Sequence, residues 1–356
     1  MKRALSEVVR KSKRVKLQKA EVSLVLPERL MGIEIEAEVT SNTSLPRAVA
    51  GWQRASDGSL RDGLEYKLAQ PLAGDMLAGA IEAMFASAKF ERRHTSSCHI
   101  HIDILEEEVT EDVLQAMFLL MFMTEEVAYQ VGDPGRKWCS FTNQLTYLNV
   151  EQIAALVMGQ EEFNQKYNAK LGYRSGSDHF SERLQGGSRY IGLNVQSMWK
   201  YGSIEFRYFP TPETKEELYN WVNLVQSYMK AAQEVGGREG IESVMSNRSS
   251  YEAFISSYFS PWVREFSTHA DYDVAKQKLL YALTIADSAV VQDVAVPSVY
   301  NVHTRFKRGK ANKAEVSEEA MPEEVVAPTP APQEVPDLGP TLAPPNTETE
   351  ARRNAL

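Results

Sequence analysis

The stretch GIEIEAE, residues 32–38, alternates charged and apolar side chains over its whole length. Side chains two positions apart in a β-strand share a face, so this alternation predicts a strand with Glu34, Glu36 and Glu38 on one face. The other face is fully apolar, as in an inner strand backed by helices. Three neighbouring carboxylates repel one another unless solvent or cations neutralise them. The row is therefore either an exposed polar face or a set of hard oxygen ligands for Mg²⁺.

A second alternating stretch, CHIHID at residues 98–103, places His99, His101 and Asp103 on one face. A lone strand histidine is usually structural, whereas His-x-His-x-Asp on one face is typical of a metal or phosphate site. Cys98 points to the other face, and the chain contains no CxxC or HExxH motif. The pattern therefore disfavours structural zinc.

The third stretch, SIEFR at residues 203–207, places Glu205 and Arg207 on one face. Such a pair is often only an ion pair between strands, which contributes little. Beside the other two strands, Glu205 is instead expected to bind a metal and Arg207 to bind an anionic substrate group through two parallel hydrogen bonds. Asn194, in the preceding predicted strand, is a neutral ligand that suits a metal or a phosphate.

The remaining periodic segments predict an α+β fold. Strands are expected at 31–39, 63–69, 97–105, 189–197 and 202–209, and helices at 75–87, 111–131, 149–158, 213–233, 249–259 and 273–287. Thr214 and Glu217 form a capping-box pattern at the start of the helix expected at 213–233. Single strands separated by one helix or a long loop fit an α+β fold better than a regular repeat of βαβ units.

Composition excludes several classes of protein. The chain has 356 residues, of which 43% are hydrophobic and 24% charged, as in ordinary globular proteins. No apolar run approaches the roughly 20 residues that span a bilayer, and no apolar segment follows the basic N-terminus as in a signal peptide. Two cysteines, Cys98 and Cys139, make a disulfide framework improbable, so a cytoplasmic protein is expected. Neither common glycine-rich nucleotide-binding loop is present.

Charge divides the chain into three predicted parts. Residues 1–20 form a basic arm, with eight Lys and Arg side chains against Glu7. The arm is either a solvated or mobile extension, or a contact for nucleic acid or an acidic partner. Residues 21–308 form the folded domain, whose acidic balance argues against a nucleic-acid surface. Residues 309–356 are rich in proline and glutamate, and are expected to be disordered.

The order of these motifs resembles that of the amidoligase-like proteins, which are carboxylate–amine ligases related to glutamine synthetase and glutamate–cysteine ligase. The motifs, in chain order, are GIEIE at 32–36, DGSL at 57–60 with GLE at 63–65, CHIHID at 98–103, RY at 189–190 with LN at 193–194, and SIEFR at 203–207. The resemblance spans roughly residues 30–235. Members of this family occur in bacteria and their phages, among other hosts.

The resemblance implies a glutamine-synthetase-like fold, in which helices back a curved antiparallel sheet and the concave face holds the site. It also implies ATP with Mg²⁺ or Mn²⁺ and amide or peptide bond formation through an acyl phosphate. By position, the implied metal ligands are Glu34, Glu36, Glu65, His99, His101 and Glu205. The implied catalytic residues are Glu34, Glu36, Glu205 and Arg207, and the implied cofactor-binding residues are Arg189, Asn194, His99 and His101.

One departure from the family pattern follows Glu65, where the family tends to have a Ser-Pro step and this chain has Tyr66-Lys67-Leu68. The ligase reading implies small-molecule or peptide carboxylates and amines as substrates, no membrane, and compatibility with an oligomer. Two rival classes stay open. The same side chains suit another metal-dependent hydrolase, and the extended termini suit an inactive protein of this fold with a binding or assembly role.

Overall fold

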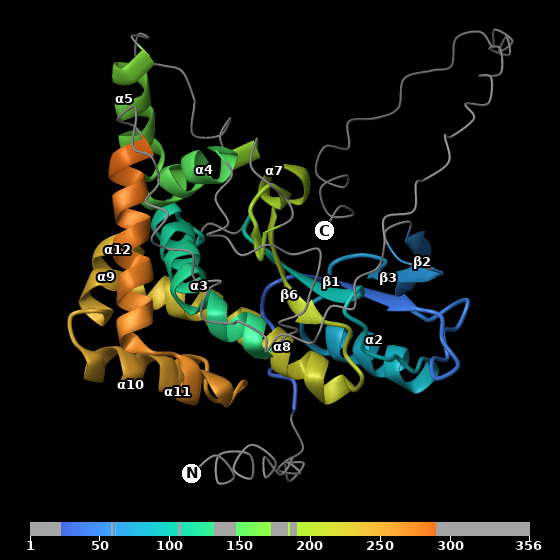
Figure 1. The fold of residues 1–356 in the computed structure, drawn as a ribbon. Coiled ribbons are helices and arrows are strands. Elements are labelled where there is room, and N and C mark those ends of the chain that lie inside the picture. The colour runs from blue at the N-terminus through green and yellow to red at the C-terminus, as the bar shows by residue number, and fades with distance from the viewer. Residues whose placement is uncertain are drawn as a thin grey trace, which may run out of the picture. The chain divides into compact units, whose positions relative to one another are not determined.

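The computed structural model describes residues 23–57, 60, 62–105, 108–131, 147–171, 184–185 and 191–289 (Figure 1). All of these belong to one of two compact units of the chain, and the other unit, Asp293–Glu348, lies outside the described residues. The predicted basic arm and acidic tail also lie outside them, so the boundaries at residues 20 and 308 stay predictions. Among the described helices, none has the length and apolar character needed to cross a membrane.

Six strands form one open antiparallel sheet in the order β2-β3-β1-β4-β6-β5. Their bounds are Met31–Glu38 for β1, Trp52–Asp57 for β2, Gly63–Leu68 for β3, Ser97–Asp103 for β4, Leu193–Asn194 for β5 and Ser203–Pro210 for β6. The expected mixture of helices with an antiparallel sheet is therefore confirmed. The strands expected near residues 31, 63, 97 and 202 are all present, with ends within two residues of those expected.

Two sequence expectations about strands are corrected. The strand expected at 189–197 is reduced, within the described residues, to Leu193–Asn194. The chain turns there because the Asn194 side chain accepts a hydrogen bond from the Gln196 backbone N–H at 3.0 Å, and Ser197 Oγ donates to the Asn194 carbonyl at 2.8 Å. Helix α7 then begins at Ser197. Strand β2 was not expected, because WQRASD has little apolar alternation and its described side chains after Trp52 are exposed, as suits an edge strand.

The described helices are more numerous than the periodicity indicated. Their bounds are Gly74–Ser87 for α2, Glu111–Val131 for α3, Tyr147–Met158 for α4, Gln160–Leu171 for α5, Ser197–Tyr201 for α7, Lys215–Val235 for α8, Gly237–Val244 for α9, Arg248–Tyr258 for α10, Glu265–His269 for α11 and Tyr272–Ala289 for α12. Six of these match predicted helices. The predicted cap of α8 is confirmed, since Thr214 Oγ1 accepts a hydrogen bond from the Glu217 backbone N–H at 3.3 Å.

One face of the sheet is apolar and packs on helices α2 and α8 (Figure 1). The alternate residues of β1 on this face, Met31 to Ala37, are at most 1% exposed. Phe206 of β6 packs on Tyr228 of α8 with ring centroids 5.8 Å apart, and the Trp52 indole N–H donates to the Ala80 carbonyl of α2 at 2.9 Å. This face is therefore the core, and the polar residues of the same strands lie on the opposite face.

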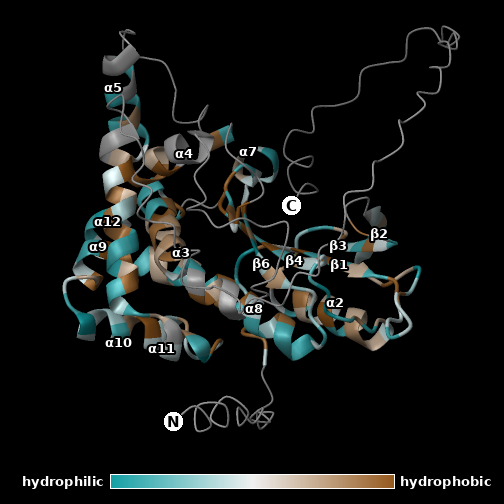
Figure 2. Ribbon diagram, viewed as in Figure 1, coloured by the Kyte–Doolittle hydropathy of each residue, from teal (hydrophilic) through white to brown (hydrophobic). Residues whose placement is uncertain are grey.

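Helix α3 holds a second part of the core, packed against α8, α9 and α12. It is largely brown in Figure 2, whereas α8, α9 and α10 carry hydrophilic stretches. Residues 116–125 of α3 are buried without interruption. Such a helix, apolar around most of its circumference, is typical of the interior of a large domain. The helices thus fix the sheet from its apolar side.

Candidate metal centre

The register of the four central strands brings the predicted residues into neighbouring cross-strand pairs. Glu34 of β1 lies between Lys67 of β3 and His99 of β4. Two residues further along β4, His101 lies opposite Glu205 of β6. Directly paired side chains in an antiparallel sheet have Cβ atoms about 4.5–5.5 Å apart, so these groups are in contact distance across the strands.

Glu34, His101 and Glu205 form a cluster with the geometry of a metal site. One ligand atom of each, two carboxylate oxygens and an imidazole nitrogen, all lie within 4.8 Å of one another. His101 and Glu205 are buried, and Glu34 is partly buried. Carboxylates with one imidazole suit a divalent ion such as Mg²⁺ or Mn²⁺ better than a thiol-seeking metal. The three residues therefore fit one such ion.

His101 is oriented by Ser203, which the sequence analysis did not single out. Nδ1 of His101 lies 3.0 Å from Ser203 Oγ. If the imidazole donates from Nδ1, its Nε2 is left as an acceptor, and Nε2 is the atom 3.9 Å from Glu34 Oε1. Ser203, Glu205 and Arg207 alternate along β6, so the sequence pattern placed Ser203 on the correct face.

His99 lies among the glutamates and contacts three of them. Its Nδ1 is 3.1 Å from Glu34 Oε2 and 3.3 Å from Glu205 Oε1, and its Nε2 is 3.8 Å from Glu36 Oε1. Nε2 also lies 2.9 Å from Ser97 Oγ. In this arrangement His99 links carboxylates through both ring nitrogens, so its ring orientation is fixed within the cluster.

A β-bulge positions Arg207 beside the cluster. Cys98 pairs with Phe209 while Ile100 pairs with Phe206, so Arg207 and Tyr208 together lie opposite His99. Bulges of this kind change the direction in which a side chain points and are common beside functional sites. Arg207 forms an ion pair with Glu205, and its Nη1 lies 3.5 Å from His99 Nδ1. The guanidinium therefore lies at the edge of the candidate metal site.

Asn194 of β5 completes the surroundings of Glu205. Its Nδ2 donates to Glu205 Oε2 at 2.6 Å, while Arg207 pairs with Oε1. Both oxygens of Glu205 thus have a fixed partner. Asn194 was expected to be cofactor-binding, and the structure places it next to a candidate ligand carboxylate.

Glu36, Glu65 and Lys67 form the other side of the site. Glu36 lies directly opposite Glu65 across β1 and β3, and Ser97 Oγ donates to Glu36. Lys67 Nζ lies 2.9 Å from Glu65 Oε2 and 3.2 Å from Glu34 Oε1. The sequence analysis noted Lys67 only as a departure from the family. Its spacing of two residues from Glu65 on one strand was a signal that both share this face.

Protonation states also favour cation binding. Burial would raise the pKa of Glu34, but the hydrogen bond from His99, the charges of His99 and His101 when their imidazoles are protonated, and the charge of Lys67 hold it well below its usual range. For Glu205, burial is likewise outweighed by His99, Arg207 and His101, and its pKa is lowered. Burial lowers the pKa of the His101 imidazole, despite Glu205 and Glu34 nearby. At neutral pH the three groups are thus two carboxylates and a neutral imidazole, the forms that bind a metal.

Arg189, the ninth predicted site residue, is outside the described residues. Asp103, at the end of β4, shares the face of His101, but its Oδ1 accepts the Leu105 backbone N–H at 3.0 Å and ends the strand. The structure therefore brings together eight of the nine predicted site residues, which are Glu34, Glu36, Glu65, His99, His101, Asn194, Glu205 and Arg207.

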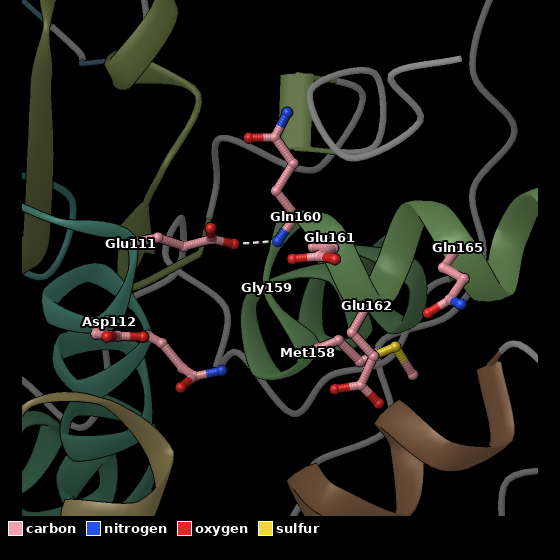
Figure 3. Close-up of a pocket in the computed structure, with 9 residues that line it drawn as sticks. Glu111, Asp112, Met158, Gly159, Gln160, Glu161, Glu162 and Gln165 are labelled. Atoms are coloured by element: carbon pink, nitrogen blue, oxygen red, sulfur yellow. Dashed lines mark hydrogen bonds between the residues drawn. The ribbon is translucent and has the colours of Figure 1, made fainter. Parts of the chain in front are cut away.

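A separate cavity of about 300 Å³ lies where helices α3 and α5 begin (Figure 3). Glu111 of α3 accepts a hydrogen bond from the Gln160 backbone N–H. Gly159, between α4 and α5, has φ +81, a conformation that residues with a side chain rarely adopt, and it lies close to the Glu111 carboxylate. The cavity is acidic, but the residues that line it are not among the predicted site residues, and its hydrogen bonds are those of two helix starts.

Comparison with known proteins adds a family match over part of the chain. Residues 75–229 match the family described as "Putative amidoligase enzyme". No curated protein matches the chain. Among solved structures, a bifunctional glutathione synthetase from Pasteurella multocida matches with 10% identity and a TM-score of 0.28, over 74% of this chain and 48% of that one. The chain thus spans about half the length of that structure, and a likeness of this degree carries no argument about the site.

The matched segment runs from α2 into α8 and includes β4, β5 and β6, with His99, His101, Asn194, Glu205 and Arg207. Strand β1 and its glutamates precede it. Over residues 75–229 the chain is similar to the amidoligases, which confirms the resemblance inferred from its motifs.

Proposed function

We propose that this protein is an ATP-dependent carboxylate–amine ligase that forms an amide or peptide bond through an acyl phosphate. The observation that carries the proposal is the cluster of Glu34, His101 and Glu205, drawn from three adjacent strands and bordered by Arg207. The amidoligase match over residues 75–229 supports the reaction class. The antiparallel sheet with its polar face opposite the helices is compatible with a glutamine-synthetase-like fold, which we propose with it.

In this proposal Glu34, His101 and Glu205 hold Mg²⁺ or Mn²⁺. Glu36, Glu65 and His99 line the same site. When bound, the ion neutralises negative charge on the phosphoryl group that is transferred. Arg189 and Asn194 are proposed for the nucleotide side.

The reaction requires activation because a carboxylate has no good leaving group at neutral pH. One oxygen of the substrate carboxylate attacks the γ-phosphorus of ATP, the bond to the β-phosphate oxygen breaks, and ADP leaves. The amine then attacks the acyl carbon and inorganic phosphate leaves. Arg207 binds an anionic group of the reactants, which favours the in-line arrangement, and a carboxylate of the site accepts the proton of the amine.

The test is the release of ADP and phosphate by the purified chain with Mg²⁺, ATP and pools of amino acids, amines and carboxylates. We expect release only when a productive carboxylate and amine are both present. Glu34→Gln and Glu205→Gln should each lower turnover by at least about 100-fold, the loss typical of removing one group that stabilises developing charge. Glu38→Gln is the matched control, because Glu38 lies on the same face of β1 but hydrogen-bonds Thr95 outside the cluster.

Three outcomes would contradict the proposal. Phosphate release from simple phosphoesters without ATP would indicate a metal-dependent hydrolase. Failure of ATP with Mg²⁺ to raise the melting temperature would indicate a protein that does not bind them. Wild-type turnover in Glu34→Gln or Glu205→Gln would show that the site is wrong.

A further inference from the structure

Lys67 places a fixed positive charge inside the carboxylate site. Its Nζ lies 2.9 Å from Glu65 Oε2 and 3.2 Å from Glu34 Oε1, and its side chain is 43% exposed. These two glutamates come from different strands, so the ammonium bridges β3 and β1. The role proposed above for Glu34, His101 and Glu205 leaves Lys67 unexplained.

The bridge lies where carboxylates would otherwise gather without a counter-charge. Glu65 lies directly opposite Glu36, and Glu34 is the neighbouring acid on the same face of β1. Like charges directly opposite each other in a sheet are destabilising unless neutralised. Burial, and after it the charge of Glu34, raises the pKa of Glu65. Without Lys67, these three carboxylates would lie close together with no ammonium between them.

Glu34 is shared between this group and the cluster with His101 and Glu205. Its Oε1 lies 3.2 Å from Lys67 Nζ and 3.9 Å from His101 Nε2, so one carboxylate contacts both the ammonium and the candidate metal position. Lys67 contacts Glu34 and Glu65, and Arg207 contacts Glu205, so each of these cations neutralises carboxylates of the site.

We propose that Lys67 occupies the place of a second divalent cation, so that the site takes one ion, at Glu34, His101 and Glu205. This inference rests on the proposed function in taking the cluster as a metal site. It goes further in assigning the ion count and in treating Glu65 as neutralised by an ammonium in the wild-type chain. It also gives a physical meaning to the sequence departure after Glu65.

The test counts Mn²⁺ bound per full-length chain, by equilibrium dialysis and the electron paramagnetic resonance signal of free Mn²⁺. Weak Mn²⁺ binding elsewhere on the acidic chain is the same in every variant, so it cancels when the count of one variant is subtracted from that of another. Wild type should bind one ion more than Glu205→Gln. Lys67→Ala should bind one ion more than wild type, because Glu34, Glu36 and Glu65 then lack their ammonium. Lys67→Ala combined with Glu65→Gln should return to the wild-type count.

Lys215→Ala is the matched control, because Lys215 is 38% exposed and pairs with Glu82 away from the site. Its Mn²⁺ count should equal that of wild type. If Lys67→Ala fails to fold, Lys67→Met keeps the length of the side chain and removes its charge, and it should show the same gain.

The outcomes separate this inference from the function on which it rests. The inference would be overturned if wild type bound two more Mn²⁺ ions than Glu205→Gln, or if neither Lys67 variant bound more ions than wild type. Either result would leave a metal site in place. Equal Mn²⁺ counts in wild type and Glu205→Gln would instead show that the cluster does not bind a metal ion.

Discussion

His101 presents Nε2 to the carboxylates because Ser203 engages its other ring nitrogen at 3.0 Å. Partners of this kind set the tautomer and the orientation of a metal-binding imidazole. Ser203 is fully buried, so no water molecule at the surface can take over the contact without repacking. The affinity of the proposed site for a metal should therefore depend on a residue that is not itself a ligand.

Ser203→Ala tests this dependence. We expect Mn²⁺ affinity to fall by about 10–100-fold, the loss typical of removing a partner of a ligand imidazole. Ser96→Ala is the matched control, since Ser96 is equally buried but hydrogen-bonds Thr211 rather than a histidine. Titration with Mn²⁺ by calorimetry gives both values. Equal affinity in wild type and Ser203→Ala would show that Ser203 does not orient the ligand.

Individual residues were predictable from the sequence where alternation alone decides their face. Glu34, His101 and Glu205 were all placed correctly in this way, and Cys98 is buried on the apolar side as expected. The pairing partners were not predictable. Lys67 reaches Glu34 only because β3 pairs with β1 in one particular register, and a shift by one residue would turn it to the other face.

Helix α8 is the element that supports the strands of the site from the apolar side. It begins after Thr214, whose Oγ1 accepts the Glu217 backbone N–H. It ends at Val235 and is followed by Gly236 in the left-handed conformation with φ 65. The Glu217 carboxylate accepts the Glu213 backbone N–H rather than that of Thr214, so half of the expected reciprocal capping box is present. A helix with defined caps holds Trp221 and Tyr228 against β6.

Thr214→Ala should lower the free energy of unfolding by about 1 kcal/mol, because one backbone N–H of the first turn loses its acceptor. Thr284→Ala is the control, since Thr284 is exposed within α12 and donates a hydrogen bond to the Leu280 carbonyl of its own helix rather than capping a helix start. That variant should change stability by less than about 0.5 kcal/mol. Urea unfolding followed by circular dichroism measures both. Equal effects of the two substitutions would contradict a capping role.

Elements in which apolar residues recur at a regular spacing were predictable from the sequence, and elements without such a spacing were not. Helix α3 matches its prediction at both ends, because its apolar residues recur over the whole length. Helix α5 has the sequence QEEFNQKYNAKL, in which apolar residues are few and Phe163 is buried, so its pattern is too weak to indicate a helix. Helix α9 begins at Gly237, a poor helix former, and packs on α3.

At the scale of the whole molecule, the proposed site depends on contacts between segments far apart in the chain. His99 and Glu34 are 65 residues apart, and His101 and Ser203 are 102 apart. The sequence indicated three polar strand faces, and their family-like order suggested that they meet. The order β3-β1-β4-β6 could not be derived from local patterns, because strand pairing is non-local.

The central claim is that these distant strands bind one divalent ion together. Pulsed electron paramagnetic resonance of Mn²⁺ bound to the full chain tests it most directly, because a coordinated imidazole nitrogen modulates the electron spin echo. We expect nitrogen modulation in wild type, its loss in His101→Gln, and its retention in the control His94→Gln, whose histidine lies outside the cluster. Absence of nitrogen modulation in wild type, or its persistence in His101→Gln, would contradict the account.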